Sequence, residues 1–143
     1  MKIYLDNCCF NRPFDNQDQF VTVLETEAKL YIQQMVIDKK IELIWSFILD
    51  YENNDNPYIE RKERISVWSN LATIDINSSP DIISKAEEIM QLGIKSKDAL
   101  HISCAIAGNA ECFITTDKRI LNKTIAGIII INPIDFIRRY FYD

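Results

Sequence analysis

Hydrophobic and polar positions change their period several times along the chain, and each change predicts a new element. Short apolar runs rich in β-branched residues alternate with longer segments whose apolar residues recur every three or four positions. The short runs predict strands over residues 2–6, 41–46, 71–74, 112–115 and 128–131. The longer segments predict helices over residues 19–39, 47–52, 58–70, 80–92, 96–107, 118–123 and 133–142. This alternation predicts an α/β fold, a three-layer sandwich with about five mainly parallel strands and helices on both faces.

Capping residues mark the expected starts of several helices. Ser46, Ser79 and Ser96 each precede a helical segment and are expected to act as N-caps. Asp18 is expected to cap the helix over residues 19–39, and Pro57 suits the first position of the helix that follows it. Between the first strand and the first long helix, the segment 7–17 is rich in Asp and Asn and predicts a loop.

Two acids flank the most apolar part of the chain. The helix over residues 96–107 has little polar surface and should be buried, with Asp98 in its first turn, where the helix dipole favours a negative charge. Asp117 directly follows the short apolar strand over residues 112–115. This helix and strand therefore carry carboxylates to one edge of the sheet.

The composition narrows the class of protein. The chain has 143 residues, of which 48% are hydrophobic and 26% charged, which is ordinary for a globular protein and predicts one domain over residues 1–143. An acid at Asp6 does not suit a signal peptide, and no apolar run approaches the roughly 20 residues of a membrane span. We therefore expect a cytoplasmic protein without a membrane partner. The net charge of −5 argues against a general polyanion binder but not against a local basic patch.

The four cysteines predict neither a disulfide framework nor a metal site. Cys8 and Cys9 are adjacent, Cys104 lies in the buried helix and Cys112 in a strand, and none has metal-ligand spacing with the single histidine, His101. Free, buried thiols are the better interpretation.

Four acids are expected to converge at the carboxyl edge of the sheet, where ligands bind in such folds. They are Asp6, Glu52, Asp98 and Asp117. Singly, each is readily explained as a helix cap or a solvated group. Together they would repel one another, and a divalent cation resolves the repulsion. Oxygen ligands select hard ions, so Mg²⁺ or Mn²⁺ is expected, and such a site suits metal-assisted hydrolysis of a phosphodiester.

The sequence resembles the PIN-domain family, which includes the toxin ribonucleases of toxin–antitoxin pairs. The resemblance is carried by Ile3-Tyr4-Leu5-Asp6-Asn7, by Ser46 with Glu52 six residues later, by Lys97-Asp98-Ala99-Leu100-His101-Ile102 and by Phe113-Ile114-Thr115-Thr116-Asp117. It implies a PIN-like fold and makes the four acids the metal-binding and catalytic residues. It also implies that Thr115 supports them.

Some positions leave alternatives open. Cys8 stands where many relatives carry a small hydroxyl residue, and Asp50 competes with Glu52 for the role of second acid. Arg12 suits either a phosphate contact or a surface ion pair. His101 is either a hydrogen-bonded core residue or a neighbour of the metal ligands. Lys118 and Arg119 flank Asp117 and are expected to hold a nucleic-acid backbone at the rim of the site, or to be solvated.

These observations favour a metal-dependent endoribonuclease that hydrolyses RNA and acts as a toxin inhibited by a protein antitoxin. The alternative is a non-catalytic PIN-fold module that binds protein or RNA. A receiver-like signalling domain is weakened because Asp6 has no neighbouring acid at the end of its strand. A homodimer is also expected, because large apolar residues exceed what a small domain need bury. These are Tyr58, Ile59, Ile65, Trp68, Phe136, Ile137, Tyr140 and Phe141.

Overall fold

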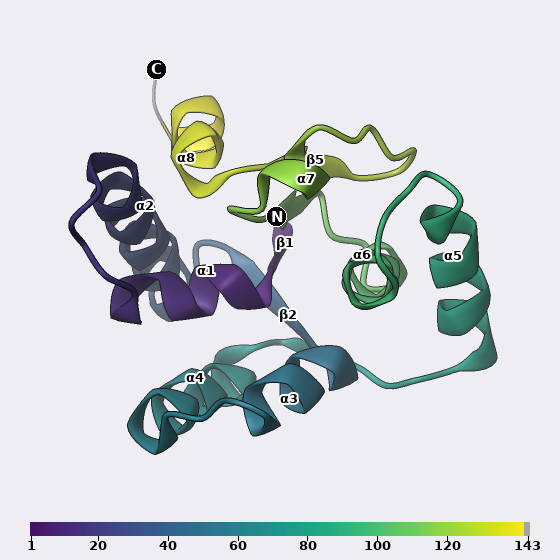
Figure 1. Cartoon of the computed structure of the whole chain (residues 1–143), viewed down its shortest axis with the longest axis horizontal. Helices are drawn as coiled ribbons and strands as arrows, with labels where there is room; N and C mark the ends of the chain where they lie inside the picture. Colours follow the sequence, from purple (N-terminus) through teal and green to yellow (C-terminus); the bar gives the residue numbers. More distant parts are fainter. Residues whose placement is uncertain (142–143) are drawn as a thin grey trace.

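A five-stranded, all-parallel sheet forms the centre of the computed structural model, which describes residues 1–141 (Figure 1). Its strands are β1 (Lys2–Leu5), β2 (Glu42–Ser46), β3 (Ile74–Ile76), β4 (Cys112–Ile114) and β5 (Ile129–Ile131). The strand order is β3-β2-β1-β4-β5, and Tyr4 of β1 is in register with Ile44 and Phe113. The predicted α/β sandwich with a parallel sheet is therefore confirmed.

Helices cover both faces of this sheet. They are α1 (Asn7–Asn11), α2 (Phe20–Ile37), α3 (Phe47–Asn54), α4 (Ile59–Leu71), α5 (Pro80–Met90), α6 (Ser96–Ala107), α7 (Lys118–Leu121) and α8 (Pro133–Phe141). A 3₁₀ turn, η1 (Arg12–Phe14), follows α1. Figure 1 shows α5 and α6 on one side of the sheet and α2 and α8 on the other. The sheet is thus enclosed, and its strands read as continuous apolar runs.

The core is built from the strands and the inward faces of α2 and α6. Its largest fully buried side chains include Tyr4, Trp45, Phe113 and Phe136. At the end of α6, Gly108 lets this helix approach β2 closely: a Cβ atom there would lie 2.9 Å from Cδ1 and 3.1 Å from Cγ2 of the buried Ile44. Packing against the sheet therefore requires a glycine at that position.

The segment after the first strand differs from the predicted loop. Residues 7–14 form α1 and η1, because the Asp6 carboxylate accepts the Asn7 N–H at 2.8 Å and Cys9 and Phe10 are buried beneath the sheet edge. Composition suggested a loop, but a cap and two buried side chains are enough to stabilise a short helix. The chain therefore turns sharply at Asp6.

Capping by Ser46 and Ser79 is confirmed, whereas three other helix starts differ from the prediction. Ser96 is the first residue of α6 rather than its cap, a position taken by Lys95. The long helix α2 is preceded by Gln19 without a side-chain cap, so Asp18 does not cap it. Pro57 lies before α4, which begins at Ile59 because the Asn56 side chain accepts the Tyr58 N–H in the preceding turn.

Smaller differences concern boundaries. The third strand lies at Ile74–Ile76 rather than 71–74, because α4 extends to Leu71. The expected end of the last helix, Tyr142, lies outside the described residues. The four cysteines are free, and all but the half-buried Cys8 are buried. Within residues 1–141, no helix has the length and hydrophobicity needed to span a bilayer.

Candidate functional site

Asp6 lies at the point where β1 ends and α1 begins. Its side chain is 5% exposed and is held by three donors: the Asn7 N–H at 2.8 Å, the Thr115 hydroxyl at 2.8 Å and the Cys8 thiol at 3.5 Å. Burial raises the pKa of this carboxyl, and the nearby charge of Glu52 adds to the increase. Cys8 and Thr115 thus orient a carboxyl group whose charged form is disfavoured by burial.

Thr115, which follows β4, connects Asp6 to Asp117 at the start of α7. Its hydroxyl oxygen accepts the Asp117 N–H at 3.1 Å while its O–H donates to Asp6. The Asp117 carboxylate caps α7 through the Arg119 N–H at 2.9 Å and forms an ion pair with the Arg119 guanidinium at 3.1 Å. These contacts with Arg119 lower the pKa of Asp117.

Glu52 comes from α3 and contacts α6. Its carboxylate lies 2.6 Å from Nε2 of His101, which is completely buried. Burial alone would raise the pKa of Glu52, but the hydrogen bond with His101 and the charge of Lys97 lower it. Glu52 is therefore ionised and fixed against the helix that carries Asp98.

A buried chain of hydrogen bonds extends from this contact into the core. The Tyr4 hydroxyl lies 2.6 Å from Nδ1 of His101 and 2.6 Å from the Ser46 hydroxyl, which also accepts the Leu49 N–H as the cap of α3. An ionised Glu52 requires a hydrogen on Nε2. The contacts of the Tyr4 hydroxyl therefore join Ser46 and His101 to Glu52 in one continuous buried chain. Both interpretations of His101 hold: it is a core histidine and it contacts a predicted site residue.

Asp98 occupies the first turn of α6, whose amino end lies at the carboxyl edge of the parallel strands. It is half-buried, and within residues 1–141 it forms none of the observed side-chain hydrogen bonds or ion pairs. Burial raises the pKa of Asp98, as do the negative charges of Asp6, Asp117 and Glu52. The four predicted acids are therefore electrostatically coupled at one edge of the sheet.

Asp50, the competing candidate for the second acid, has a different environment. Its carboxylate accepts the indole N–H of Trp45 at 2.8 Å and lies on the exposed side of α3. Its charge raises the pKa of Asp75 on the edge strand β3, after the effect of burial. The geometry favours Glu52 as the member of the acidic cluster.

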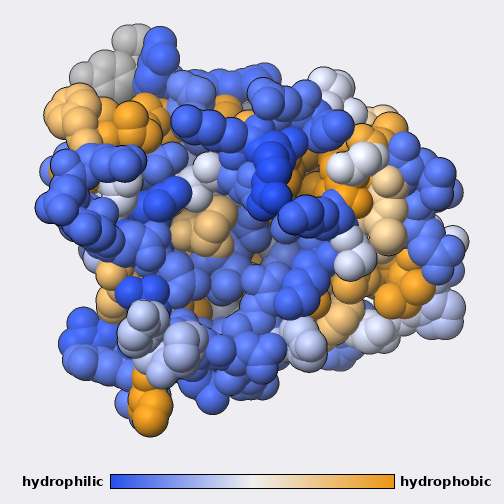
Figure 2. All heavy atoms as spheres, viewed as in Figure 1, coloured by the Kyte–Doolittle hydropathy of each residue, from blue (hydrophilic) through white to orange (hydrophobic). Residues whose placement is uncertain are grey.

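Cationic side chains border the acids. Besides Arg119, Lys95 and Lys97 are close enough to lower the pKa values of Asp117 and Glu52, respectively, after the larger local effects. A hollow of about 60 Å³ opens beside Asp98, Lys95 and Arg119. Figure 2 shows mostly hydrophilic residues around α1 and α7 on this side of the molecule.

Arg12 serves as an ion-pair partner beside this edge. Its guanidinium donates to the Thr116 hydroxyl at 3.0 Å and pairs with Asp15 at 3.2 Å and Glu25 at 3.3 Å. Of the two roles considered for Arg12, the structure supports the ion pair.

The donors fit a hard divalent ion in their chemistry, although Asp6, Glu52 and Asp117 have protein partners as they stand. Across residues 1–141, no three Asp, Glu, His or Cys side chains are arranged to hold a metal ion. Asp117 is engaged by Arg119 and Glu52 by His101, while Asp6 and Asp98 have raised pKa values that a cation would relieve. The buried Oδ1 of Asn7, which has no hydrogen-bond partner within residues 1–141, is a further oxygen donor available to such an ion.

Sequence reasoning missed the roles of Tyr4 and Asn7. The sequence places Tyr4 in the first strand and in the segment that carries the family resemblance but gives it no role, yet a tyrosine in a buried strand needs a partner for its hydroxyl. That requirement was the available signal for a polar chain beneath the site. Asn7 was treated as the start of a loop, and only the capping geometry at Asp6 brings its side chain beside Glu52.

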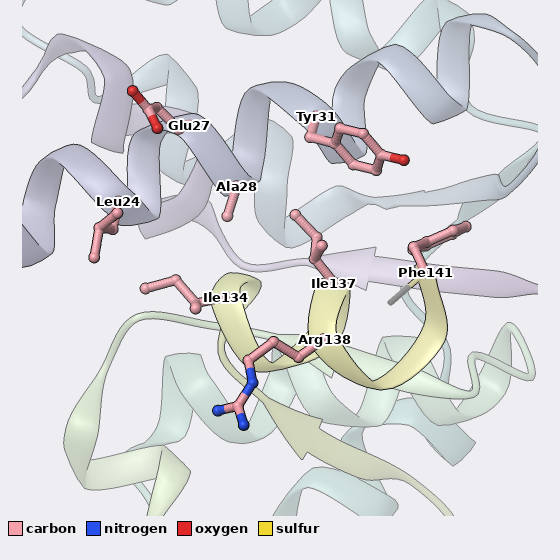
Figure 3. A pocket seen from close by; sticks show the side chains of 8 residues that line it. All are labelled: Leu24, Glu27, Ala28, Tyr31, Ile134, Ile137, Arg138 and Phe141. Atoms are coloured by element: carbon pink, nitrogen blue, oxygen red, sulfur yellow. The ribbon is translucent and has the colours of Figure 1, made fainter. Parts of the chain in front are cut away.

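A larger hollow lies away from the acids. It has a volume of about 630 Å³ between α2 and α8 and is lined mainly by apolar side chains, with Glu27 and Arg138 on opposite helices (Figure 3). None of the four acids lines it, so it has no part in the chemistry of this edge.

Comparisons with known proteins agree with this architecture. The family model described as "PIN domain" matches residues 3–125, a range that contains all four acids. A solved structure of VapBC2 from Rickettsia felis bound to a DNA fragment from their promoter is similar with a TM-score of 0.58 and 19% identity, covering 92% of this chain and 98% of that chain. No curated protein matches the sequence. The family model spans most of the chain, and the protein belongs to the PIN domain family.

Proposed function

We propose that this protein is a metal-dependent endoribonuclease that hydrolyses RNA phosphodiester bonds. The observation that carries the proposal concerns four carboxylates from separate segments at the carboxyl edge of the sheet. The negative charges of Asp6, Asp117 and Glu52 add to the effect of burial in raising the pKa of Asp98. Each acid taken singly can be explained as a helix cap or a solvated group. That explanation does not account for four like charges that interact in a partly buried site.

Asp6, Glu52, Asp98 and Asp117 are the proposed ligands of Mg²⁺ or Mn²⁺, with the Asn7 amide oxygen beside them. When bound, the ion would provide an activated water and neutralise charge on the phosphate. Thr115 and Cys8 orient Asp6, and His101 orients Glu52. If Asp117 binds the cation, it would give up its ion pair with Arg119. The Arg119 guanidinium would then be free to contact the substrate.

The cations at the rim support a polyanionic substrate despite the net charge of −5. Lys95, Lys97 and Arg119 border the acids, and Lys118 follows Asp117 directly. A phosphate backbone lying across this edge would pair with them and reach the metal. Arg12 is engaged in ion pairs with Asp15 and Glu25 and is therefore left outside this set.

The biological role proposed is that of a toxin controlled by a protein antitoxin. The support is the similarity to VapBC2 of Rickettsia felis together with membership of the PIN domain family. We also propose that the protein is cytoplasmic and forms a homodimer.

Exposed apolar side chains support the dimer. Tyr58 and Ile59 at the start of α4 are 60% and 73% exposed, so they are available for an interface, whereas Ile65 and Phe136 are buried in the core.

Cleavage of a mixed RNA pool with and without Mn²⁺ tests the activity. Asp6→Asn and Asp98→Asn are each expected to abolish divalent-dependent cleavage while the circular dichroism spectrum and melting curve show a folded protein. Asp50→Asn, which changes an acid outside the cluster, is the matched control and should retain activity. Wild-type cleavage by either site variant would contradict the assignment, and an inactive wild type that binds RNA would support the non-catalytic alternative.

Metal binding has a separate readout. A cation that binds only the folded state stabilises it by about 2.7 kcal/mol when its free concentration is a hundred times Kd. Millimolar Mn²⁺ should therefore raise the melting temperature of the wild type, and Asp98→Asn should lose most of that shift. Without metal, Asp98→Asn should leave stability unchanged or raise it, because one like charge is removed. Equal shifts in both proteins would show that the acids do not form a metal site.

A further inference from the structure

A second polar site lies among aromatic side chains on the opposite side of the molecule from α5 and α6. A hollow of about 390 Å³ opens between η1, α2 and α4. Lys29 of α2 projects into its wall with only 3% of the residue exposed. The Lys29 ammonium lies 5.3 Å from the centre of the Phe10 ring and 5.7 Å from that of Trp68. An amine is thus buried against two aromatic faces.

This amine lacks a counter-charge. Among residues 1–141, Lys29 takes part in none of the observed salt bridges or side-chain hydrogen bonds, and the acid one turn earlier, Glu25, is paired with Arg12 at 3.3 Å. Burial lowers the pKa of Lys29 to about 7. A buried cation supported only by aromatic rings remains costly, because π-faces replace a small part of its hydration.

A second unpartnered donor lines the same hollow. Gln33, one helical turn after Lys29, is 6% exposed, and its Nε2 has no hydrogen-bond partner in the described structure. Two almost completely buried residues, Lys29 and Gln33, thus direct nitrogen donors toward one hollow from the same face of α2, and neither donor has an acceptor among the described residues. Arg64 lies at the margin of the hollow and is paired with Glu60, so it leaves the two inner donors unsatisfied.

We propose that this hollow binds a small organic acid: a carboxylate that pairs with Lys29 and Gln33 and carries an aromatic or branched aliphatic body. The carboxylate supplies the acceptor that both donors lack. The apolar body would pack against Phe14, Ile65 and Trp68, which line the remaining wall. The volume lies at the lower end of the range typical of small-molecule sites, which favours a compact ligand.

The site is separate from the acidic edge, so it neither requires nor tests the nuclease activity. The ligand's negative charge would favour the protonated amine, and the exchange of an unpaired buried cation for an ion pair gives the complex its stability. A neutral ligand of the same shape would gain only the apolar contacts. The charge of the ligand is therefore the property that the experiment must vary.

The probe is 3-phenylpropionate, with 3-phenylpropionamide as its neutral counterpart, titrated into the full-length protein at about pH 6.5 and followed by protein NMR. The acid is expected to bind saturably with a Kd of about 1 mM or lower, and the amide at least tenfold more weakly. Lys29→Met, which keeps the length of the side chain, should weaken binding of the acid at least tenfold. Gln33→Met should weaken it several-fold. Lys85→Met, which removes a partly exposed lysine on α5, is the control and should bind as the wild type does.

Equal binding of the acid and the amide would overturn the proposal, as would unchanged binding to Lys29→Met. Absence of saturable binding of the acid up to about 10 mM would overturn it as well. Should Lys29→Met fail to fold, the comparison of acid with amide on the wild type and the Gln33→Met titration decide the question.

Discussion

Replacing Lys29 with methionine should stabilise the protein and change how its stability depends on pH. The amine has a pKa of about 7 in the folded protein because of burial, against 10.5 for an ordinary lysine. A difference of one between two pKa values corresponds to about 1.4 kcal/mol, so the burial of this charge costs roughly 5 kcal/mol when both states are protonated. Methionine has a similar length and retains the apolar contact with Phe10 and Trp68 without a charge.

The sign follows from proton binding. Between about pH 7 and 10.5 the unfolded chain keeps a proton on Lys29 that the folded protein has lost, so the free energy of unfolding rises with pH. The destabilisation that the Lys29 charge causes should shrink by about 2 kcal/mol from pH 7 to pH 9, which raises the free energy of unfolding of the wild type by that amount. Burial raises the pKa values of Cys9 and Cys104, which has the opposite effect above about pH 9, but both proteins share these thiols.

Urea denaturation of the wild type and Lys29→Met at pH 6, 7, 8 and 9 measures the difference. The variant should be more stable by several kcal/mol at pH 6 and 7, and the gap should narrow steadily toward pH 9. Lys85→Met, which removes a partly exposed amine paired with Glu88, should show no such pH dependence. Parallel curves for the wild type and Lys29→Met would refute the reasoning, because an amine whose pKa is the same in both states gives no pH-dependent difference.

Three further predictions address the packing, the site and the assembly. Gly108→Ala should destabilise the fold by roughly 1 to 2 kcal/mol in urea denaturation, because the new methyl group would press on the stiff, buried Ile44; unchanged stability would show that the helix can move away. Glu52→Gln should reduce RNA cleavage far more than Asp50→Asn, and the reverse order would show that the wrong acid was chosen. Sedimentation at micromolar concentration should reveal a dimer, and a single 16.7 kDa species would count against it.

The central strands were predictable because β1, β2 and β4 are largely buried and therefore read as apolar runs. Cys112–Ile114 and Ile129–Ile131 are each flanked by polar or glycine-containing turns, which sets their limits in the sequence. The positions of two acids followed from the parallel topology, since Asp6 comes directly after β1 and Asp117 lies in the turn between β4 and α7. Their electrostatic coupling needed the three-dimensional structure.

The parts that could not be predicted depend on contacts between distant segments. The short helix after β1 exists because Asp6 caps it and because Phe10 packs edge to face with Trp45 in another strand. Composition alone cannot supply that contact, so a segment rich in Asn and Asp was interpreted as a loop. The role of Glu52 was inferred from spacing, but the reason to prefer it over Asp50 is its contact with His101, 49 residues away.

The chain from Ser46 through Tyr4 and His101 to Glu52 joins the stability of the core to the geometry of the acidic edge. Each member is buried except the last, so the loss of any one leaves a polar group without a partner in a low-dielectric interior. The same chain holds one oxygen of Glu52 against α6 and leaves the carboxylate charged. Asp6 is fixed in a comparable way by Thr115, which directly follows β4. Asp98 has no such support in the described structure, and its raised pKa follows from burial and from the charges that face it. Two acids are therefore held rigidly while a third stands opposite them under repulsion, and this imbalance is what a bound cation would relieve.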